Sequence, residues 1–199
     1  MTAVPKAPAP HMSVDEFLAW SGDGSRRKFQ LVDGEPRAMA PASPTHGIIQ
    51  ANVAALLHAH LRAQGGTCHT VTEPGIVPRV RADANMRTPD VAVTCVPDDP
   101  RHRSLPDPVL LIEILSPSNE AETWESVWAY TTIPSVREIL VVRSTTAAAE
   151  LLRRQPDGNW PEQPETIGPT ADLRLDSVGF VCPLAELYAQ THLARAASR

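Results

Sequence analysis

The feature that most constrains this chain is a strand-length apolar run that carries one carboxylate. Residues 109–115 read Val-Leu-Leu-Ile-Glu-Ile-Leu, and only Glu113 is charged. Such runs are typical of strands buried on both faces of a sheet. With the period of two, Glu113 shares a face with Leu111 and Leu115, where an unpaired charge is costly. We therefore expect a cation, a metal ion or several hydrogen-bond donors beside Glu113.

A second carboxylate, Asp90, opens an earlier strand predicted at 90–96. Pro89 can precede it, because the first residue of a strand need not donate to the ladder. Two carboxylates at adjacent strand ends repel each other, and a divalent ion relieves that repulsion. Mg²⁺ favours sparse carboxylate sites that are completed by water and a substrate phosphate. The alternative is that Asp90 caps a turn and Glu113 pairs with an arginine.

Several short motifs occur in an order that resembles one known family. They are Pro89-Asp90, Glu113-Ile114-Leu115-Ser116-Pro117-Ser118, Phe29-Gln30-Leu31-Val32-Asp33-Gly34-Glu35, Ser43-Pro44-Thr45-His46 and Tyr130-Thr131-Thr132-Ile133-Pro134-Ser135-Val136-Arg137-Glu138. Over roughly residues 13–143 the chain resembles the Uma-type restriction endonuclease family, a branch of the PD-(D/E)XK nuclease superfamily. The resemblance implies an α/β (mixed α+β) fold with a restriction-endonuclease-like core, in which helices flank a mixed β-sheet.

The resemblance also implies a metal site. In the superfamily, an aspartate and a glutamate on neighbouring strands hold Mg²⁺ or Mn²⁺ with a backbone carbonyl that follows the glutamate, and the ion activates water against a DNA phosphodiester. Asp90 and Glu113 match the two carboxylates, and Ile114 or Leu115 would supply the carbonyl. His46 matches a histidine that is common in the family. At a helix start it could position water or phosphate, or simply make a helix-start hydrogen bond.

Two positions depart from the family pattern. Gln30 stands where members often carry a glutamate, and its amide oxygen is a weaker ligand than a carboxylate. Ser126 stands where members tend to carry a lysine, four residues before Tyr130. Lys28 is a candidate to replace that lysine, since an arginine stays protonated and is a poor base. Glu73 is a candidate further metal ligand.

The residues leave several classes of function open. The leading hypothesis is a metal-dependent endonuclease acting on DNA. The main rival is a catalytically weakened relative that binds nucleic acid or a protein partner without cleavage, as Gln30 and Ser126 suggest. A hydrolase using Ser116 or Ser118 with His46 is the third class, and it lacks a Gly-x-Ser-x-Gly elbow. A glycosidase needs an aromatic sugar cleft, whereas aromatic residues are only 5% of this chain.

Composition indicates an ordinary globular protein. Apolar residues make up 42% and charged residues 21% of the 199 residues, with a net charge of −5. No apolar run approaches the roughly 18 residues that cross a bilayer, and no signal peptide opens the chain, so a cytoplasmic location is expected. The negative charge argues against a protein that coats nucleic acid. Arg79 and Arg81, on a predicted strand, are expected to contact phosphate or to form a solvated edge. A homodimer would match the symmetry of duplex DNA.

The patterns predict one domain at 13–197 after a disordered Pro/Ala-rich tail at 1–12. Helices are predicted at 14–20, 46–64, 119–131 and 183–197. Strands are predicted at 26–32, 36–40, 67–72, 75–81, 90–96, 109–115, 138–143, 147–155 and 164–167. Trp124 and Trp128 are expected in the core. Cys68, Cys95 and Cys182 form no Cys-x-x-Cys pair, so each is expected to be a small buried residue without a disulfide.

Overall fold

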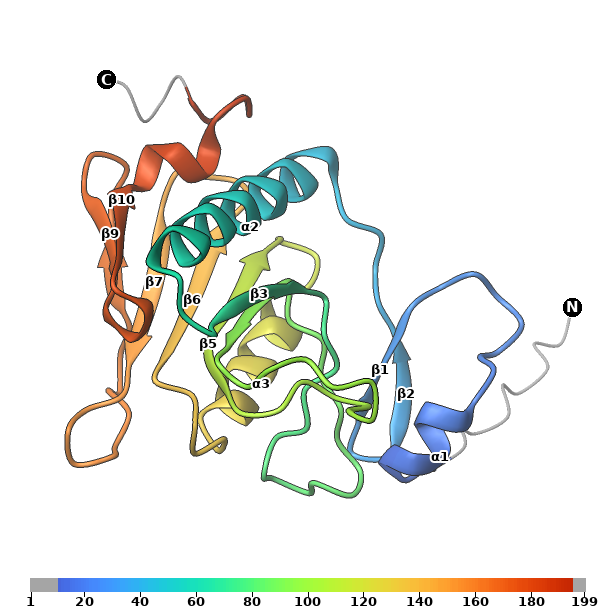
Figure 1. The fold of residues 1–199 in the computed structure, drawn as a ribbon. Helices are drawn as coiled ribbons and strands as arrows, with labels where there is room; N and C mark the ends of the chain where they lie inside the picture. The colour runs from blue at the N-terminus through green and yellow to red at the C-terminus, as the bar shows by residue number, and fades with distance from the viewer. Residues whose placement is uncertain (1–10, 195–199) are drawn as a thin grey trace, which may run out of the picture.

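The computed structural model describes residues 11–194, in which two helices cover opposite faces of a six-stranded sheet (Figure 1). The strand order is β3-β4-β5-β6-β7-β8. The strands are β3 (His69–Thr72), β4 (Val91–Thr94), β5 (Pro108–Leu115), β6 (Glu138–Arg143), β7 (Ala149–Arg153) and β8 (Glu165–Ile167). Only β5 and β6 pair in parallel, because a helix crosses between them, and the other neighbours in this sheet are antiparallel. The predicted mixed sheet is confirmed.

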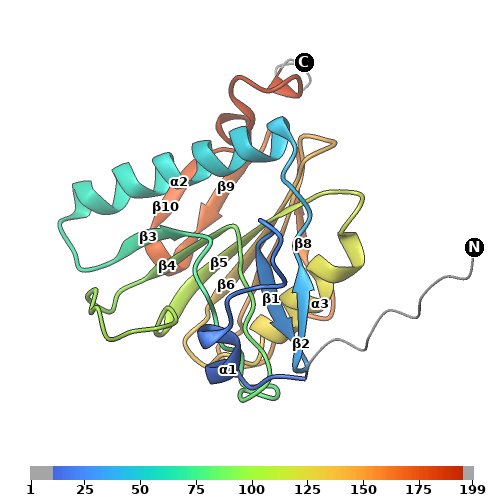
Figure 2. The same ribbon diagram turned by 90° about the vertical axis from the view of Figure 1, so that its right-hand side faces the viewer.

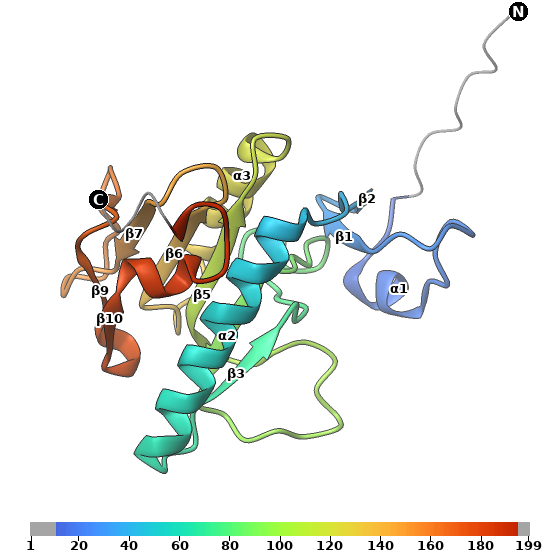
Figure 3. The same ribbon diagram turned by 90° about the horizontal axis from the view of Figure 1, so that it is seen from above.

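The side chains of β5 alternate between two cores, one on each face of the sheet. Leu110, Ile112 and Ile114 pack in the core beneath α2 (Pro44–Gln64), whereas Leu111 and Leu115 pack in the core beneath α3 (Glu120–Tyr130). Figure 3 shows α2 lying along one face of the sheet, with α3 on the other side. Glu113 contacts Tyr130 of α3 and so shares the face of Leu111 and Leu115, as the alternation predicted.

Helix α2 ends where the sequence predicted, at Gln64, and begins two residues earlier than predicted, at Pro44. The Ser43 side chain accepts a 3.2 Å hydrogen bond from the backbone N–H of His46, and Pro44 suits the first turn, where an N–H has no partner within the helix. Gly65 ends the helix with a φ of 67°, a conformation that costs glycine little. The buried residues recur at helical spacing and are His46, Ile49, Val53, Leu57 and Leu61.

The N-terminal region forms a helix and a hairpin. Helix α1 (Val14–Ala19) starts with the predicted capping box between Ser13 and Glu16. Strands β1 (Phe29–Val32) and β2 (Glu35–Ala38) meet at Asp33-Gly34, where both residues have positive φ. The hairpin lies beside α3 in Figure 2, and an ion pair joins Arg37 of β2 to Glu125 of α3 at 3.1 Å. The β1–β2 hairpin therefore lies next to α3, on one side of the end of β5.

Residues 1–10 of the expected tail lie outside the described residues. Within the described part, the backbone N–H of Met12 donates to the carbonyl of Gly34 at 2.7 Å. No helix among residues 11–194 is long and apolar enough to span a membrane.

The strand predicted at 75–81 is wrong. Ile76 makes an isolated bridge with Arg87, and turns follow at 80–84. Pro78 has no N–H to donate, and the Thr132 hydroxyl accepts hydrogen bonds from the backbone N–H groups of Arg79 and Val80. This segment is therefore attached to the end of α3 and not to the sheet, and Arg79 and Arg81 do not share a strand face.

The closing helix predicted at 183–197 is also wrong. Strands β9 (Asp172–Leu175) and β10 (Phe180–Pro183) form a hairpin around a short 3-10 helix, η1 (Asp176–Val178). Over residues 184–193 the chain then forms a 3-10 helix, η2 (Leu184–Tyr188), and turns in place of an α-helix. The Asn52 side chain of α2 donates to the carbonyls of Leu187 and Ala189, at 3.1 and 2.8 Å. These bonds use carbonyls that a longer α-helix would need. Residues 195–197 of the prediction lie outside the described part.

Two cysteines form a disulfide, contrary to the prediction. Cys68 precedes β3 and Cys95 follows β4, and the antiparallel register that pairs His69 with Thr94 places the two cysteines opposite each other. Cys182 is the buried free thiol, and burial raises its pKa to about 11.

Trp128 of α3 is 46% exposed, so its predicted core position is wrong. Trp124 and Val127 pack in the core on the α3 side, as predicted. The tryptophan rings lie 6.3 Å apart between centroids.

Candidate active site

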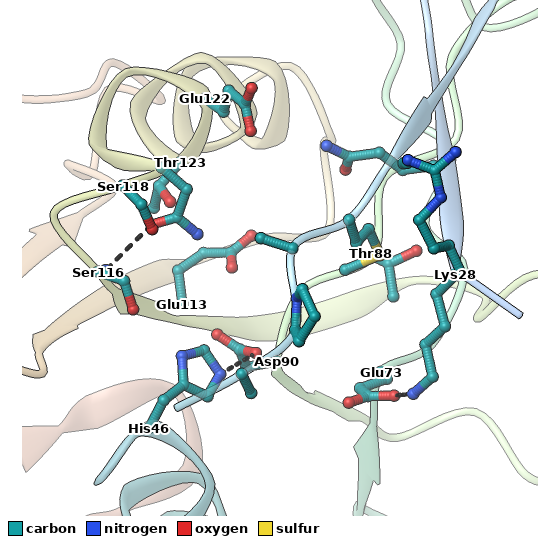
Figure 4. Close-up of a pocket in the computed structure, with 18 of the residues that line it drawn as sticks. Lys28, His46, Glu73, Thr88, Asp90, Glu113, Ser116, Ser118, Glu122 and Thr123 are labelled. Atoms are coloured by element: carbon teal, nitrogen blue, oxygen red, sulfur yellow. Dashed lines mark hydrogen bonds and ion pairs between the residues drawn. The ribbon is translucent and has the colours of Figure 1, made fainter. Parts of the chain in front are cut away.

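A pocket of about 390 Å³ opens at the end of β5, between the first turns of α2 and α3 and the β1–β2 hairpin (Figure 4). The structure brings the predicted site residues together there. Those that line the pocket are Lys28, Gln30, His46, Glu73, Asp90 and Glu113. They come from separate stretches of the chain, so the fold assembles the predicted cluster.

Two hydrogen bonds fix the Asp90 carboxylate. Its Oδ1 lies 2.8 Å from His46 Nε2, and its Oδ2 accepts a 2.6 Å bond from the backbone N–H of Ile114. The register of β4 and β5 pairs Val91 with Ile112, which places Asp90 next to Glu113. The carboxylate is therefore held at the β5 residue that follows Glu113, with His46 on its other side.

Glu113 is a buried carboxylate, 9% exposed, whose Oε1 accepts a 2.8 Å hydrogen bond from the Tyr130 hydroxyl. Burial raises the pKa of Glu113 well above its usual range, and the negative charge of Asp90 raises it further. The Tyr130 hydroxyl and the positive charge of Arg87 lower this pKa, but by less. Burial also raises the pKa of Tyr130, and Glu113 adds to that effect. A cation at Asp90 and Glu113 would relieve the repulsion between them.

Arg87 is the nearby buried cation. Its side chain is 4% exposed, and Nη2 lies 3.4 Å from Glu125 Oε1 and 3.4 Å from Asn85 Oδ1. Its Nε is buried with no partner among the described residues. No ion pair between Glu113 and an arginine occurs within residues 11–194, so the alternative of a Glu113–arginine pair is not seen there.

The departures from the family pattern lie within this pocket. Ser126, which is buried on α3, and Gln30 of β1 both line it. Lys28 forms an ion pair with Glu73. Glu73 in turn lies beside Asp90, because its backbone N–H donates to the Asp90 carbonyl at 3.1 Å. A lysine is therefore present in the pocket, on the side of the hairpin and not on α3.

The donor set fits a sparse site for a hard cation. Within the described part of the chain, no group of three His, Cys, Asp or Glu side chains is placed to hold a metal ion. Two carboxylates with a carbonyl, water and a phosphate nevertheless suit Mg²⁺. The Leu115 carbonyl already accepts from Ser144, at 3.0 Å from its N–H and 2.8 Å from its hydroxyl. Of the two predicted carbonyls, that of Ile114 is the better candidate.

The serine hydrolase alternative lacks its essential contact. The Ser116 hydroxyl lies 3.4 Å from the Ser144 hydroxyl, while His46 Nε2 contacts Asp90. The Ser116 N–H donates to Asn119 Oδ1 at 3.1 Å, as expected of a segment that starts a helix. No hydrogen bond that activates Ser116 through His46 is present among the described residues.

Sequence reasoning missed the roles of Tyr130 and Arg87. The sequence indicated Tyr130 only as part of a motif. Tyr130 nevertheless follows Ser126 by four residues and Thr123 by seven, and so shares their helix face. That periodicity could have placed Tyr130 beside the site. Arg87 gave no such signal, because it lies outside the helices and strands and pairs with Ile76 through an isolated bridge.

Comparisons with known proteins bear on the fold and on the family of this chain. A crystal structure described as "a putative nuclease belonging to DUF820" from Anabaena variabilis matches with a TM-score of 0.72 at 15% identity, and the match covers 89% of this chain and 98% of that one. The chain therefore shares the fold of that protein. An "Uncharacterized protein slr1290" of Synechocystis sp. is 32% identical over 158 residues, which cover 78% of this chain and 81% of that protein.

The sequence model of one family matches residues 14–185 and carries the description "Uma2: Putative restriction endonuclease". The chain belongs to the Uma2 family. The resemblance drawn from the motifs is thus confirmed.

Proposed function

We propose that this protein is a metal-dependent endonuclease that hydrolyses phosphodiester bonds of DNA at Asp90 and Glu113, with Mg²⁺ or Mn²⁺ as its cofactor. Membership of the Uma2 family and the nuclease-like fold support this function. The observation that carries it is the juxtaposition of two carboxylates in one pocket, where burial, and then the charge of Asp90, raise the pKa of Glu113. Such a pair is stabilised by a divalent cation.

In this proposal Asp90, Glu113 and the Ile114 carbonyl hold the cation. The bound ion would polarise the phosphodiester and lower the pKa of an attacking water. His46 orients Asp90 through the 2.8 Å contact, and Tyr130 orients Glu113 in the same way. Gln30 offers an amide oxygen from the hairpin side of the pocket.

A second function is favoured by Gln30 and Ser126, which line the pocket without the charges that the family pattern supplies. On this alternative the protein binds nucleic acid or a protein partner and does not cleave. Metal-dependent cleavage separates the two functions.

The test incubates supercoiled plasmid and single-stranded DNA with Mg²⁺, Mn²⁺ or EDTA. Glu113→Gln keeps the shape of the side chain and removes its charge, and Glu162→Gln makes the same change at an exposed position outside the pocket. We expect wild type and Glu162→Gln to cut only with metal, and Glu113→Gln not to cut. If none of the three cuts while all remain folded, the binding function is the better account.

We also propose that residues 13–197 form one domain, which the match over 14–185 supports, and that the protein acts as a homodimer. The dimer is proposed from the two-fold symmetry of duplex DNA. Sedimentation equilibrium with and without a duplex tests it, and a monomer under both conditions would contradict it.

A further inference from the structure

The pocket carries more negative charge than its proposed ligands can balance. Asp90, Glu113, Glu73 and Glu122 all line it, and a phosphodiester adds a further negative charge. One divalent cation offsets only part of this total. Arg87 does not line the pocket, and its guanidinium is directed to Glu125 and Asn85. An anionic substrate therefore needs a positive side chain on the pocket wall.

Three basic residues, Arg26, Arg27 and Lys28, line the pocket on the hairpin side. Arg27 is already bound, because its Nη2 lies 2.9 Å from Asp23 and its guanidinium lies 5.7 Å from the centre of the Phe29 ring. Lys28 differs from Arg27 in where its side chain runs. Figure 4 shows it extending along the pocket to Glu73, and it is 67% exposed. Lys28 is thus an accessible cation on this wall, and its charged end pairs with Glu73, which also lines the pocket.

Glu73 determines where the end of Lys28 lies. The Glu73 N–H donates to the Asp90 carbonyl at 3.1 Å, so the Glu73 backbone adjoins the carboxylate pair. Glu73 also has a φ of 49°, in the left-handed region, which a residue with a side chain adopts at a cost. An ammonium group has three donors, so Lys28 can keep Glu73 and still bind a second anion.

We propose that Lys28 binds a non-bridging oxygen of the scissile phosphate and stabilises the charge that develops there, with Glu73 as the residue that positions it. The inference rests on the proposed function and adds the side chain that receives the anionic part of a nucleic acid backbone. Preorganised positive charge of this kind acts on the transition state. No proton transfer is assigned to Lys28.

Helix α3, on the wall of the pocket opposite Lys28, offers a second position for a lysine. Ser126 lies one helical turn before Tyr130, whose hydroxyl reaches Glu113, and Ser126 also lines the pocket. A lysine at position 126 would therefore approach the same carboxylate from α3. If the site needs one cation near the phosphate, Ser126→Lys should replace a missing Lys28.

The first test measures binding of a labelled DNA duplex by fluorescence anisotropy, with Ca²⁺ in place of Mg²⁺, across a range of KCl concentrations. A lost phosphate contact lowers the slope of log K against log salt concentration by about 0.9. We expect Lys28→Ala to show this decrease with weaker binding. Arg101→Ala removes the same charge from a side chain that is 86% exposed and outside the pocket, and should leave the slope unchanged. A wild-type slope for Lys28→Ala would overturn the assignment.

The second test measures single-turnover cleavage with Mg²⁺. Loss of one charge-stabilising donor costs roughly 10²–10³-fold in rate, so we expect that loss for Lys28→Ala and a recovery of about tenfold or more in Lys28→Ala/Ser126→Lys. Glu73→Gln should slow cleavage less than Lys28→Ala does. If wild type cuts, Glu113→Gln does not and Lys28→Ala cuts at the wild-type rate, the proposed function stands and the role of Lys28 fails.

Failure of the proposed nuclease activity can also be distinguished from failure of the role of Lys28. If wild type does not cut but Lys28→Ala lowers the salt slope, phosphate binding by Lys28 stands and the nuclease activity fails.

Discussion

The Tyr130 hydroxyl donates a 2.8 Å hydrogen bond to Oε1 of Glu113, and both side chains are buried. This bond joins α3 to the carboxylate of β5. It opposes the two effects that raise the pKa of Glu113, which are burial and the charge of Asp90. Tyr130 therefore helps to keep Glu113 ionised and in place, although it makes no proposed contact with substrate.

Tyr130→Phe should raise the pKa of Glu113 further, because the hydroxyl stabilises the ionised form. We expect the acidic limb of the pH–rate profile to move to higher pH. Mn²⁺ affinity should fall about tenfold, since a hydrogen bond to a charged group contributes about 1.5–3 kcal/mol. Tyr188→Phe is the matched control: Tyr188 is also buried, but its hydroxyl donates to the Arg143 and Ala148 carbonyls. An equal shift in both variants would contradict this account.

Glu113→Gln should stabilise the metal-free protein at neutral and alkaline pH. The raised pKa of Glu113 means that the folded state binds a proton more tightly than the unfolded state. The contribution of Glu113 to the free energy of unfolding is therefore greatest below its pKa in the unfolded state, about 4.5. This contribution is lost as the pH rises through the pKa of Glu113 in the folded state. We expect a gain of about 1 kcal/mol in the free energy of unfolding at pH 8, typical of substitutions that relieve an active site.

Urea unfolding of wild type and Glu113→Gln at pH 4 and pH 8 measures this effect. The difference in the free energy of unfolding between wild type and Glu113→Gln should be larger at pH 8 than at pH 4. Adding Mn²⁺ should stabilise wild type and leave the variant unchanged. A variant that is less stable than wild type at pH 8 without metal would show that Glu113 is not destabilising.

His46→Ala should weaken metal binding by about 10–100-fold, the usual cost of losing a residue that orients a metal ligand. The Ile114 N–H would still hold Asp90 Oδ2, so we expect the fold to persist. Isothermal titration with Mn²⁺ measures the affinity. His60→Ala is the control on the same helix, because His60 contacts the Val178 carbonyl away from the pocket. Equal affinities of His46→Ala and wild type would exclude the orienting role.

Much of the sheet could be predicted because its strands are local patterns. The alternation around Glu113 predicted β5 and the face of the sheet on which each of its side chains lies. Strand β6, Glu138–Arg143, was predicted with the bounds that the structure shows. The segment at 75–81 failed because its hydrogen bonds go to Thr132, which is distant in sequence. The closing helix failed for a similar reason, since Asn52 caps the carbonyls that would extend it.

The site residues were predictable as residue types, but their contacts were not. Asp90, Glu113 and His46 were predicted from sequence, and the fold places all three in one pocket. The Glu113–Tyr130 bond depends on how α3 docks on the sheet, which no local pattern encodes. The ion pair between Lys28 and Glu73 joins residues that are 45 positions apart, so it too required the fold.

The cysteines give a prediction of their own. With Cys68 and Cys95 bonded, denatured protein prepared without reductant should show one reactive thiol, Cys182, and three after reduction. Removing the bond should cost about 2–4 kcal/mol in the free energy of unfolding, since the two cysteines are 27 residues apart. Thiol titration with Ellman's reagent and urea unfolding of Cys68→Ala measure both. Three thiols without reductant would contradict the disulfide.

The central claim is that Asp90 and Glu113 together hold a divalent cation. Crystals grown with Mn²⁺, measured at the manganese absorption edge, test it most directly. We predict an anomalous peak at roughly 2–2.3 Å from a carboxylate oxygen of each residue, and its loss in Glu113→Gln. Full occupancy of Mn²⁺ elsewhere, with no peak between Asp90 and Glu113, would contradict the account.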